Sequence, residues 1–120
     1  MGTTGDLVDL WRNASQVAVL TGAGVSTDSG ISDFRGPNGL WTRNPSAQAM
    51  FDIDTYLRDP DVRRQAWANR RDNPAWTAEP NRGHQALAAL QRSGHLGTLM
   101  TQNIDGLHQR AGSVGVLELH

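Results

Sequence analysis

The sequence contains no cysteine, which excludes a disulfide framework and a thiolate metal site among its 120 residues. It also lacks an apolar run of the roughly 20 residues that a membrane-spanning helix needs. The N-terminus has neither the basic stretch nor the apolar run of a signal peptide. The formal net charge is −1, so no basic surface for nucleic acid is expected. We therefore predict a cytoplasmic protein with no membrane association and no direct nucleic-acid contact.

Three short apolar segments alternate with helical patterns along the chain. Residues 16–20, 96–101 and 114–119 are expected to be buried strands, and Asn81 is expected to cap a helix that carries Leu87 and Leu90 and stops at Gly94. Residues 5–14 should form a first helix, with Leu7, Leu10 and Trp11 on one face. The alternation predicts an α/β fold, part of a Rossmann-like parallel sheet with helices on its faces.

The middle of the chain is expected to be less regular. Glycines and prolines between residues 25 and 45 predict a loop, and short helices joined by turns should follow, for example around residues 61–71. We expect a cofactor-binding loop at about residues 25–50 and a small helical segment at about 51–80, both within one portion of a domain, 1–120. The chain stops directly after a predicted strand, and we expect it to be a fragment with an incomplete sheet.

Four clusters carry side chains suited to chemistry. Gly22-Ala23-Gly24 follows a predicted strand, where glycines let backbone N–H groups approach a diphosphate. The dehydrogenase fingerprint would need a third glycine at Thr27, so a turn without a ligand is an equal alternative. In residues 29–36, Arg35 can pair with a phosphate and Phe34 can cover a flat ring, unless the segment is an ordinary surface loop.

The other two clusters follow the second and third predicted strands. Of Asn103 and Asp105, one is expected to cap a short helix at residues 105–111, and the other to face a pocket. His120 has the pKa range of a general base. The three other histidines show no metal-ligand spacing and are interpreted as structural or exposed: His84, His95 and His108.

Taken in this order, the clusters closely resemble the sirtuin family, NAD-dependent protein-lysine deacylases, and bacterial members in particular. The resembling segments are GAGVSTDSGISDFRGPNGLW (22–41), AEPNRGHQAL (78–87), TQNIDGLH (101–108) and LELH (117–120). The resemblance implies that His120 is the catalytic base that takes a proton from a ribose hydroxyl. It also implies a set of NAD-binding residues: Gly22, Ala23, Gly24, Ser26, Thr27, Ile31, Asp33, Phe34, Arg35, Trp41, Gln102, Asn103, Ile104 and Asp105.

Individual roles follow from the same resemblance. Gly22 to Gly24 would cradle the diphosphate, and Phe34 would shield the cleavage site from water. The nicotinamide pocket would comprise Ile31 and residues 103–105, with Asp105 holding the carboxamide. The implied partners are acyl-lysine proteins, and the implied products are nicotinamide, free lysine and O-acyl-ADP-ribose. Alternatives are an NAD-dependent ADP-ribosyltransferase and a non-catalytic NAD-binding fragment. An ordinary dehydrogenase ranks behind both, because no acidic residue follows Gly22 by about twenty positions.

Three departures from the family pattern bear on these expectations. Ser32 stands where family members usually carry proline, which fixes φ, so we expect a changed loop order rather than lost activity. Some desuccinylating members carry Tyr-x-x-Arg in the acyl pocket, and the nearest match is Trp67 with Arg70, which are equally compatible with an exposed helix face. The family's four-cysteine zinc module has no counterpart among these residues. Zinc is therefore expected only in the full-length protein.

Overall fold

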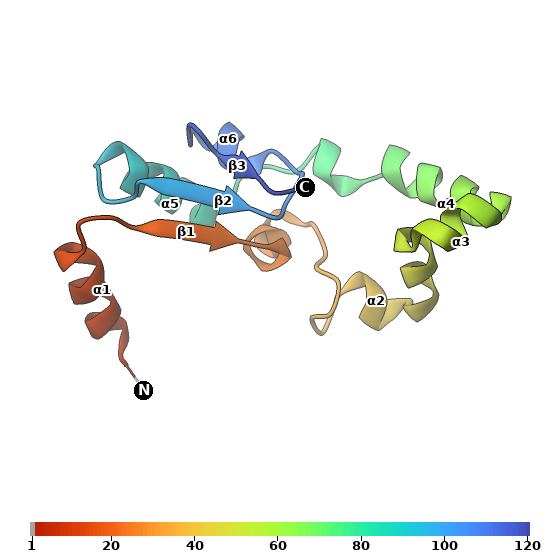
Figure 1. Cartoon of the computed structure of the whole chain (residues 1–120), viewed down its shortest axis with the longest axis horizontal. Helices are drawn as coiled ribbons and strands as arrows, with labels where there is room; N and C mark the ends of the chain where they lie inside the picture. Colours follow the sequence, from red (N-terminus) through yellow and green to blue (C-terminus); the bar gives the residue numbers. More distant parts are fainter. Residues whose placement is uncertain (1) are drawn as a thin grey trace.

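A three-stranded parallel sheet forms one part of the computed structural model, which describes residues 2–120 (Figure 1). Its strands are β1 (Ala18–Thr21), β2 (Thr98–Thr101) and β3 (Leu117–Glu118), in the order β1-β2-β3. The predicted α/β parallel sheet is thus confirmed. The third strand is shorter than residues 114–119, because Gly115 has a φ of 62° and leaves the extended conformation just before it.

Two helices cover one face of this sheet. Helix α5 (Arg82–Arg92) begins at Asn81, whose side-chain oxygen accepts a hydrogen bond of 2.8 Å from the Gly83 N–H. Gly94 follows its end with a φ of 82°, which confirms both predicted boundaries. Helix α6 (Leu107–Arg110) packs against α5. The core lies between these helices and the sheet, where the largest fully buried side chains include Leu99, Leu107, His84 and His108.

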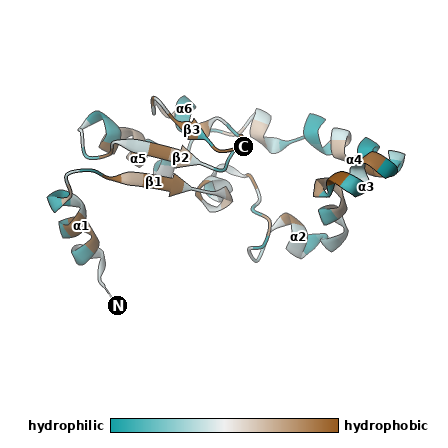
Figure 2. Cartoon of the chain, viewed as in Figure 1, coloured by the Kyte–Doolittle hydropathy of each residue, from teal (hydrophilic) through white to brown (hydrophobic). Residues whose placement is uncertain are grey.

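The opposite face of the sheet is open and apolar. Leu20, Met100 and Leu117 lie in register across the three strands, and the Leu20 and Leu117 side chains are 56% and 52% exposed. Apolar colouring on β1 and β2 is visible in Figure 2. Helix α1 (Thr4–Asn13) is joined to the sheet end by Trp11, whose indole N–H donates to the His95 carbonyl at 2.6 Å.

The middle of the chain leaves the sheet and forms a string of short helices (Figure 1). They are η1 (Ala23–Ser29), α2 (Leu40–Arg43), η2 (Pro45–Phe51), α3 (Ile53–Arg58), α4 (Pro60–Arg71) and η3 (Pro74–Trp76). The predicted loop at residues 25–45 is therefore wrong in part, since η1 overlaps its start and α2 lies within it. The predicted helix around residues 61–71 is confirmed as α4, which begins at the capping side chain of Asp59.

The molecule is elongated as a result. Its radius of gyration is 17.2 Å, against about 14 Å for a compact domain of this length. The chain returns from the helical part to α5 and β2, so β1 and β2 pair across the whole insertion. Within residues 2–120, no helix combines the length and apolar character required to cross a membrane.

Candidate functional site

The carboxyl ends of all three strands meet at one edge of the sheet. The chain runs from β1 into Gly22, from β2 into Gln102, and from β3 into Leu119 and His120. Hydrogen bonds of 3.0 Å from Gln102 N to Thr21 O and of 2.9 Å from Leu119 N to Thr101 O align these exits. The C-terminal His120 lies at this edge in Figure 1. Three of the four predicted clusters are therefore adjacent.

Ser26 forms the centre of a polar network at this edge. It is 1% exposed, and its hydroxyl donates to Asp105 Oδ2 at 2.6 Å. The Asn103 amide donates to Gly22 O at 2.9 Å and to Ser26 Oγ at 3.3 Å. Asp105 Oδ1 also accepts from the Leu107 N–H at 3.0 Å, so this one residue both supports the start of α6 and faces the site. Of the two residues, Asp105 is thus the one whose side chain supports the start of α6, while the Asn103 amide contacts Gly22 and Ser26.

His84 completes this network and is the functional candidate that sequence reasoning missed. Its Nδ1 accepts from the Asn81 N–H at 3.1 Å, so its Nε2 carries the proton in the neutral ring and donates to Ser26 Oγ at 3.2 Å. The signal was present in the sequence. A capping residue such as Asn81 followed three positions later by a hydrogen-bonding side chain is a capping-box pattern, and it fixes the ring of His84.

His108 lies beside His84, with ring centroids 4.9 Å apart at 70°. Thr21 donates to Thr101 Oγ1 at 2.9 Å, so the 2.7 Å contact of Thr21 Oγ1 with His108 Nε2 makes that nitrogen the donor. Thr101 Oγ1 accepts in addition from the Asn103 N–H at 3.1 Å. These contacts tie α6 to the ends of β1 and β2 and fix the backbone of Asn103.

Both histidines are held neutral. Burial lowers the pKa of His84, and the Asp105 carboxylate offsets this only in part. Burial also lowers the pKa of His108, with a smaller contribution in the same direction from His84 and an opposing one from Asp105. The site therefore holds two uncharged imidazoles at neutral pH.

Acidification is expected to destabilise the protein through this pair. In the unfolded chain both histidines take up protons as the pH falls through about 6.5, while the folded chain takes them up only below their lowered pKa values. Between those pH limits the unfolded state binds more protons than the folded state, so the free energy of unfolding decreases as the pH is lowered. The melting temperature should drop between pH 7 and pH 5.5. His108→Gln should flatten this slope, whereas the exposed His95 replaced by Gln should leave it steep. Equal slopes in all three proteins would contradict the prediction.

The loop after η1 folds into a short hairpin over the site. Leu40 N donates to Asp33 O at 2.7 Å, and Trp41 N donates to Phe34 O at 2.9 Å. The rings of Phe34 and Trp41 lie 5.0 Å apart, and the Arg35 guanidinium lies 5.1 Å from the Trp41 ring centroid. A pocket of about 360 Å³ lies between this loop and Ala23. The Asp33-Phe34-Arg35 segment thus meets the glycine turn, as expected for one site.

The other predicted cofactor residues are not among those that line this pocket, and their exposures differ. The Ile104 side chain is 73% exposed, whereas Ile31 is half-buried and its N–H donates to Ser26 O at 3.4 Å. Thr27 is exposed, and its hydroxyl donates to Gly24 O at 3.0 Å. Gln102 lies beside Gly22, where an added Cβ would come 3.4 Å from its side-chain oxygen.

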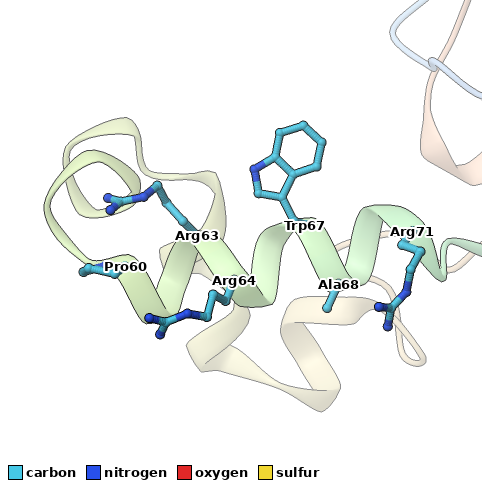
Figure 3. Close-up of a pocket in the computed structure, with 6 residues that line it drawn as sticks. All are labelled: Pro60, Arg63, Arg64, Trp67, Ala68 and Arg71. Atoms are coloured by element: carbon cyan, nitrogen blue, oxygen red, sulfur yellow. The ribbon is translucent and has the colours of Figure 1, made fainter.

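Trp67 and Arg70 lie on α4, away from the strand ends (Figure 1). The Arg70 guanidinium lies 5.8 Å from the Trp67 ring centroid, and the Trp67 indole N–H donates to the Tyr56 hydroxyl at 3.0 Å. A second hollow, of about 620 Å³, runs along α4. Figure 3 draws the residues that line it: Pro60, Arg63, Arg64, Trp67, Ala68 and Arg71. The structure therefore pairs Trp67 with Arg70 but does not bring them to the sheet edge.

A parallel sheet with glycines, amides, a carboxylate and a histidine at its carboxyl edge is the arrangement of nucleotide-binding α/β proteins. The model of the Sir2 family matches residues 22–120, and the chain belongs to that family. The resemblance to sirtuins drawn from the sequence is confirmed.

Similar proteins carry names that are consistent with membership of this family. NAD-dependent protein deacetylase 2 of Streptomyces coelicolor is 56% identical over 106 residues, covering 87% of this chain and 44% of that protein. The NAD-dependent protein deacetylase of Chromobacterium violaceum is 50% identical over 118 residues, covering 95% and 47%. A solved Sir2 structure with deacetylated peptide and 3′-O-acetyl ADP ribose has a TM-score of 0.85 at 41% identity, covering 98% of this chain and 47% of that one. The chain thus spans about half the length of these relatives.

Proposed function

We propose that the protein carrying this chain is a cytoplasmic, NAD-dependent protein-lysine deacylase, with acetyl-lysine as its main substrate. The observation that carries the proposal is the convergence of the Gly22–Gly24 turn, the Asn103–Asp105 segment and His120 at one edge of the sheet. The names of the relatives support it, since both are NAD-dependent deacetylases. Zinc, with ligands outside these residues, is a further expectation from the family resemblance.

The residues around the glycine turn fit a dinucleotide. A Cβ at Gly24 would meet no heavy atom within 4 Å, so the backbone there is open to a ligand. Trp41 Nε1 is buried and has no hydrogen-bond partner among residues 2–120, and Trp41 lines the pocket formed with Ala23 and Arg35. A buried donor without a partner is costly unless a ligand or water accepts from it. We assign the diphosphate to the Gly22–Gly24 backbone and to Arg35.

The remaining assignments follow from position at the sheet edge. Bound NAD would supply an ADP-ribosyl group that takes up the acyl group while nicotinamide is released. Asp105, fixed by Ser26 and by the Leu107 N–H, would accept a hydrogen bond from the nicotinamide amide. His120 would remove a proton from a ribose hydroxyl. Phe34 would exclude water from the reacting atoms.

Mass spectrometry of an acetyl-lysine peptide incubated with the full-length protein tests the proposed function. Loss of the acetyl group only when NAD is present, together with O-acetyl-ADP-ribose, is the expected result. Transfer of ADP-ribose onto protein without loss of acetyl would instead support an ADP-ribosyltransferase. Binding of NAD by the folded protein with neither product would reduce the assignment to a cofactor-binding role.

A preference for acidic acyl groups can be tested at Arg70. If its guanidinium pairs with a succinyl carboxylate, Arg70→Ala should lower desuccinylation about 10- to 100-fold, because a charge-assisted hydrogen bond contributes roughly 1.5–3 kcal/mol. Deacetylation should stay nearly unchanged. The comparison requires kcat/KM for acetyl and succinyl peptides of one sequence. Arg64→Ala, on the same helix, serves as the matched control. Equal losses on both peptides would reject a role for Arg70 in the acyl pocket.

A further inference from the structure

Helix α2 contacts the hairpin loop with two side chains that the proposed chemistry does not use. The Thr42 hydroxyl donates to Gly36 O at 2.7 Å. The Arg43 guanidinium donates from Nε to Asn38 O and from Nη2 to Ser32 Oγ, each at 3.0 Å. These three acceptors lie at the start, the turn and the returning half of the loop. Two consecutive residues of one helix thus fasten the loop at three points.

The fastened segment is the same one that forms the pocket wall. Asp33, Phe34, Arg35 and Gly36 line the pocket, and all lie between the attachment points at Ser32 and Asn38. Gly39 lets the two halves of the loop touch, since a Cβ there would lie 2.5 Å from Phe34 O. A side chain at this position would push Phe34 away from Trp41. The loop conformation therefore depends on a close backbone approach and on the donors of α2.

We propose that Thr42 and Arg43 are positioning residues that hold the hairpin loop in its NAD-binding conformation before NAD binds. This inference rests on the proposed function for its ligand, and on the hydrogen bonds of α2 for its mechanism. A loop that is already ordered loses less conformational entropy when the ligand binds, and affinity rises by that difference. Family members usually carry proline at position 32, and proline restrains the backbone by fixing φ. The hydrogen bond from Arg43 to the Ser32 hydroxyl supplies a restraint at the same position.

The planar guanidinium distinguishes this role from simple attraction of an anion. Arg43 uses two nitrogens of its fork at once, one for Asn38 and one for Ser32. A lysine ammonium keeps the positive charge but presents a single nitrogen on a flexible stem. Arg43→Lys should therefore behave like Arg43→Ala if the residue positions the loop. It should behave like the wild type if Arg43 only attracts the diphosphate.

Kinetics of the full-length protein give the first test. Thr42→Val, Ser32→Ala, Arg43→Ala and Arg43→Lys should each raise KM for NAD about three- to tenfold, as expected for loss of one or two exposed hydrogen bonds, with kcat within about twofold. In the double variant Ser32→Ala with Arg43→Ala, the fold-increase in KM should be smaller than the product of the two single fold-increases. Arg12→Ala, an exposed arginine of α1, is the charge-matched control. Unchanged KM values, or full rescue by Arg43→Lys, would overturn the proposal.

Trypsin cleavage after Arg35 gives a second test that needs no activity. Without NAD, Thr42→Val and Ser32→Ala should accelerate this cut several-fold, because the loop opens more often. Saturating NAD should slow the cut in the variants. An unchanged cleavage rate would refute the positioning role even if the enzyme is active. If the wild type shows no deacylation but the variants are cut faster, the proposed function fails while the role of α2 stands.

Discussion

Replacement of His120 by alanine in the full-length protein should lower kcat for deacylation by at least about 100-fold, the usual contribution of a general base. His120 follows β3 and reaches the sheet edge at which Gly22 and Gln102 leave their strands. It is exposed, so it makes no contribution to the core. The loss should therefore fall on the chemical step, and the affinity for NAD should stay nearly unchanged.

The measurement pairs a single-turnover deacetylation assay with calorimetric titration of NAD. His95→Ala is the matched control, because His95 is also exposed but contacts Ser93 at the far end of α5. That variant should retain wild-type turnover. Full activity in His120→Ala would remove this residue from the mechanism, and joint loss of turnover and NAD affinity would assign it to binding.

Asp105→Asn should weaken inhibition by nicotinamide about 10- to 100-fold, in line with the loss of hydrogen bonds to a charged acceptor. The carboxylate accepts from the Ser26 hydroxyl at 2.6 Å and from the Leu107 N–H at 3.0 Å. An asparagine amide has one oxygen, so one of these donors must face an NH2 group instead. The substitution therefore disturbs the proposed amide acceptor and the Ser26–His84 contact together.

Nicotinamide exchange, measured with labelled nicotinamide, separates this effect from general destabilisation. Asp28→Asn is the control, because Asp28 is exposed on η1 and its substitution also removes one negative charge. Thermal unfolding of both variants should be compared before their kinetics. An unchanged nicotinamide response in a stably folded Asp105→Asn protein would remove Asp105 from the nicotinamide pocket.

Sequence reasoning predicted the features that depend on neighbouring residues. Helix α5 was predicted with both ends, because Asn81 supplies a local cap and Gly94 a local stop. The proximity of residues 22–24, 102–105 and 120 could also be inferred from the sequence, since parallel strands place their carboxyl ends at one edge of the sheet.

Features that depend on contacts between distant residues were not predicted. Burial of His84 and His108 in one edge-to-face pair requires α5 and α6 to pack together. The contact of Arg43 with Ser32 requires the loop to close on α2, which composition alone does not indicate. Glycines and prolines at residues 25–45 suggested irregular backbone, yet 3₁₀ turns and a single α-turn tolerate them.

The pairing of β1 with β2 also has a consequence for how the chain folds. Thr21 and Thr101, which exchange a hydrogen bond at the site, lie 80 residues apart in the sequence. Closing so long a segment costs entropy before any pairing compensates for it, and folds of this kind form slowly. During synthesis, β1 leaves the ribosome long before β2, its partner strand within residues 2–120, exists. The site around the glycine turn therefore cannot assemble until β2 and the residues that follow it have been made.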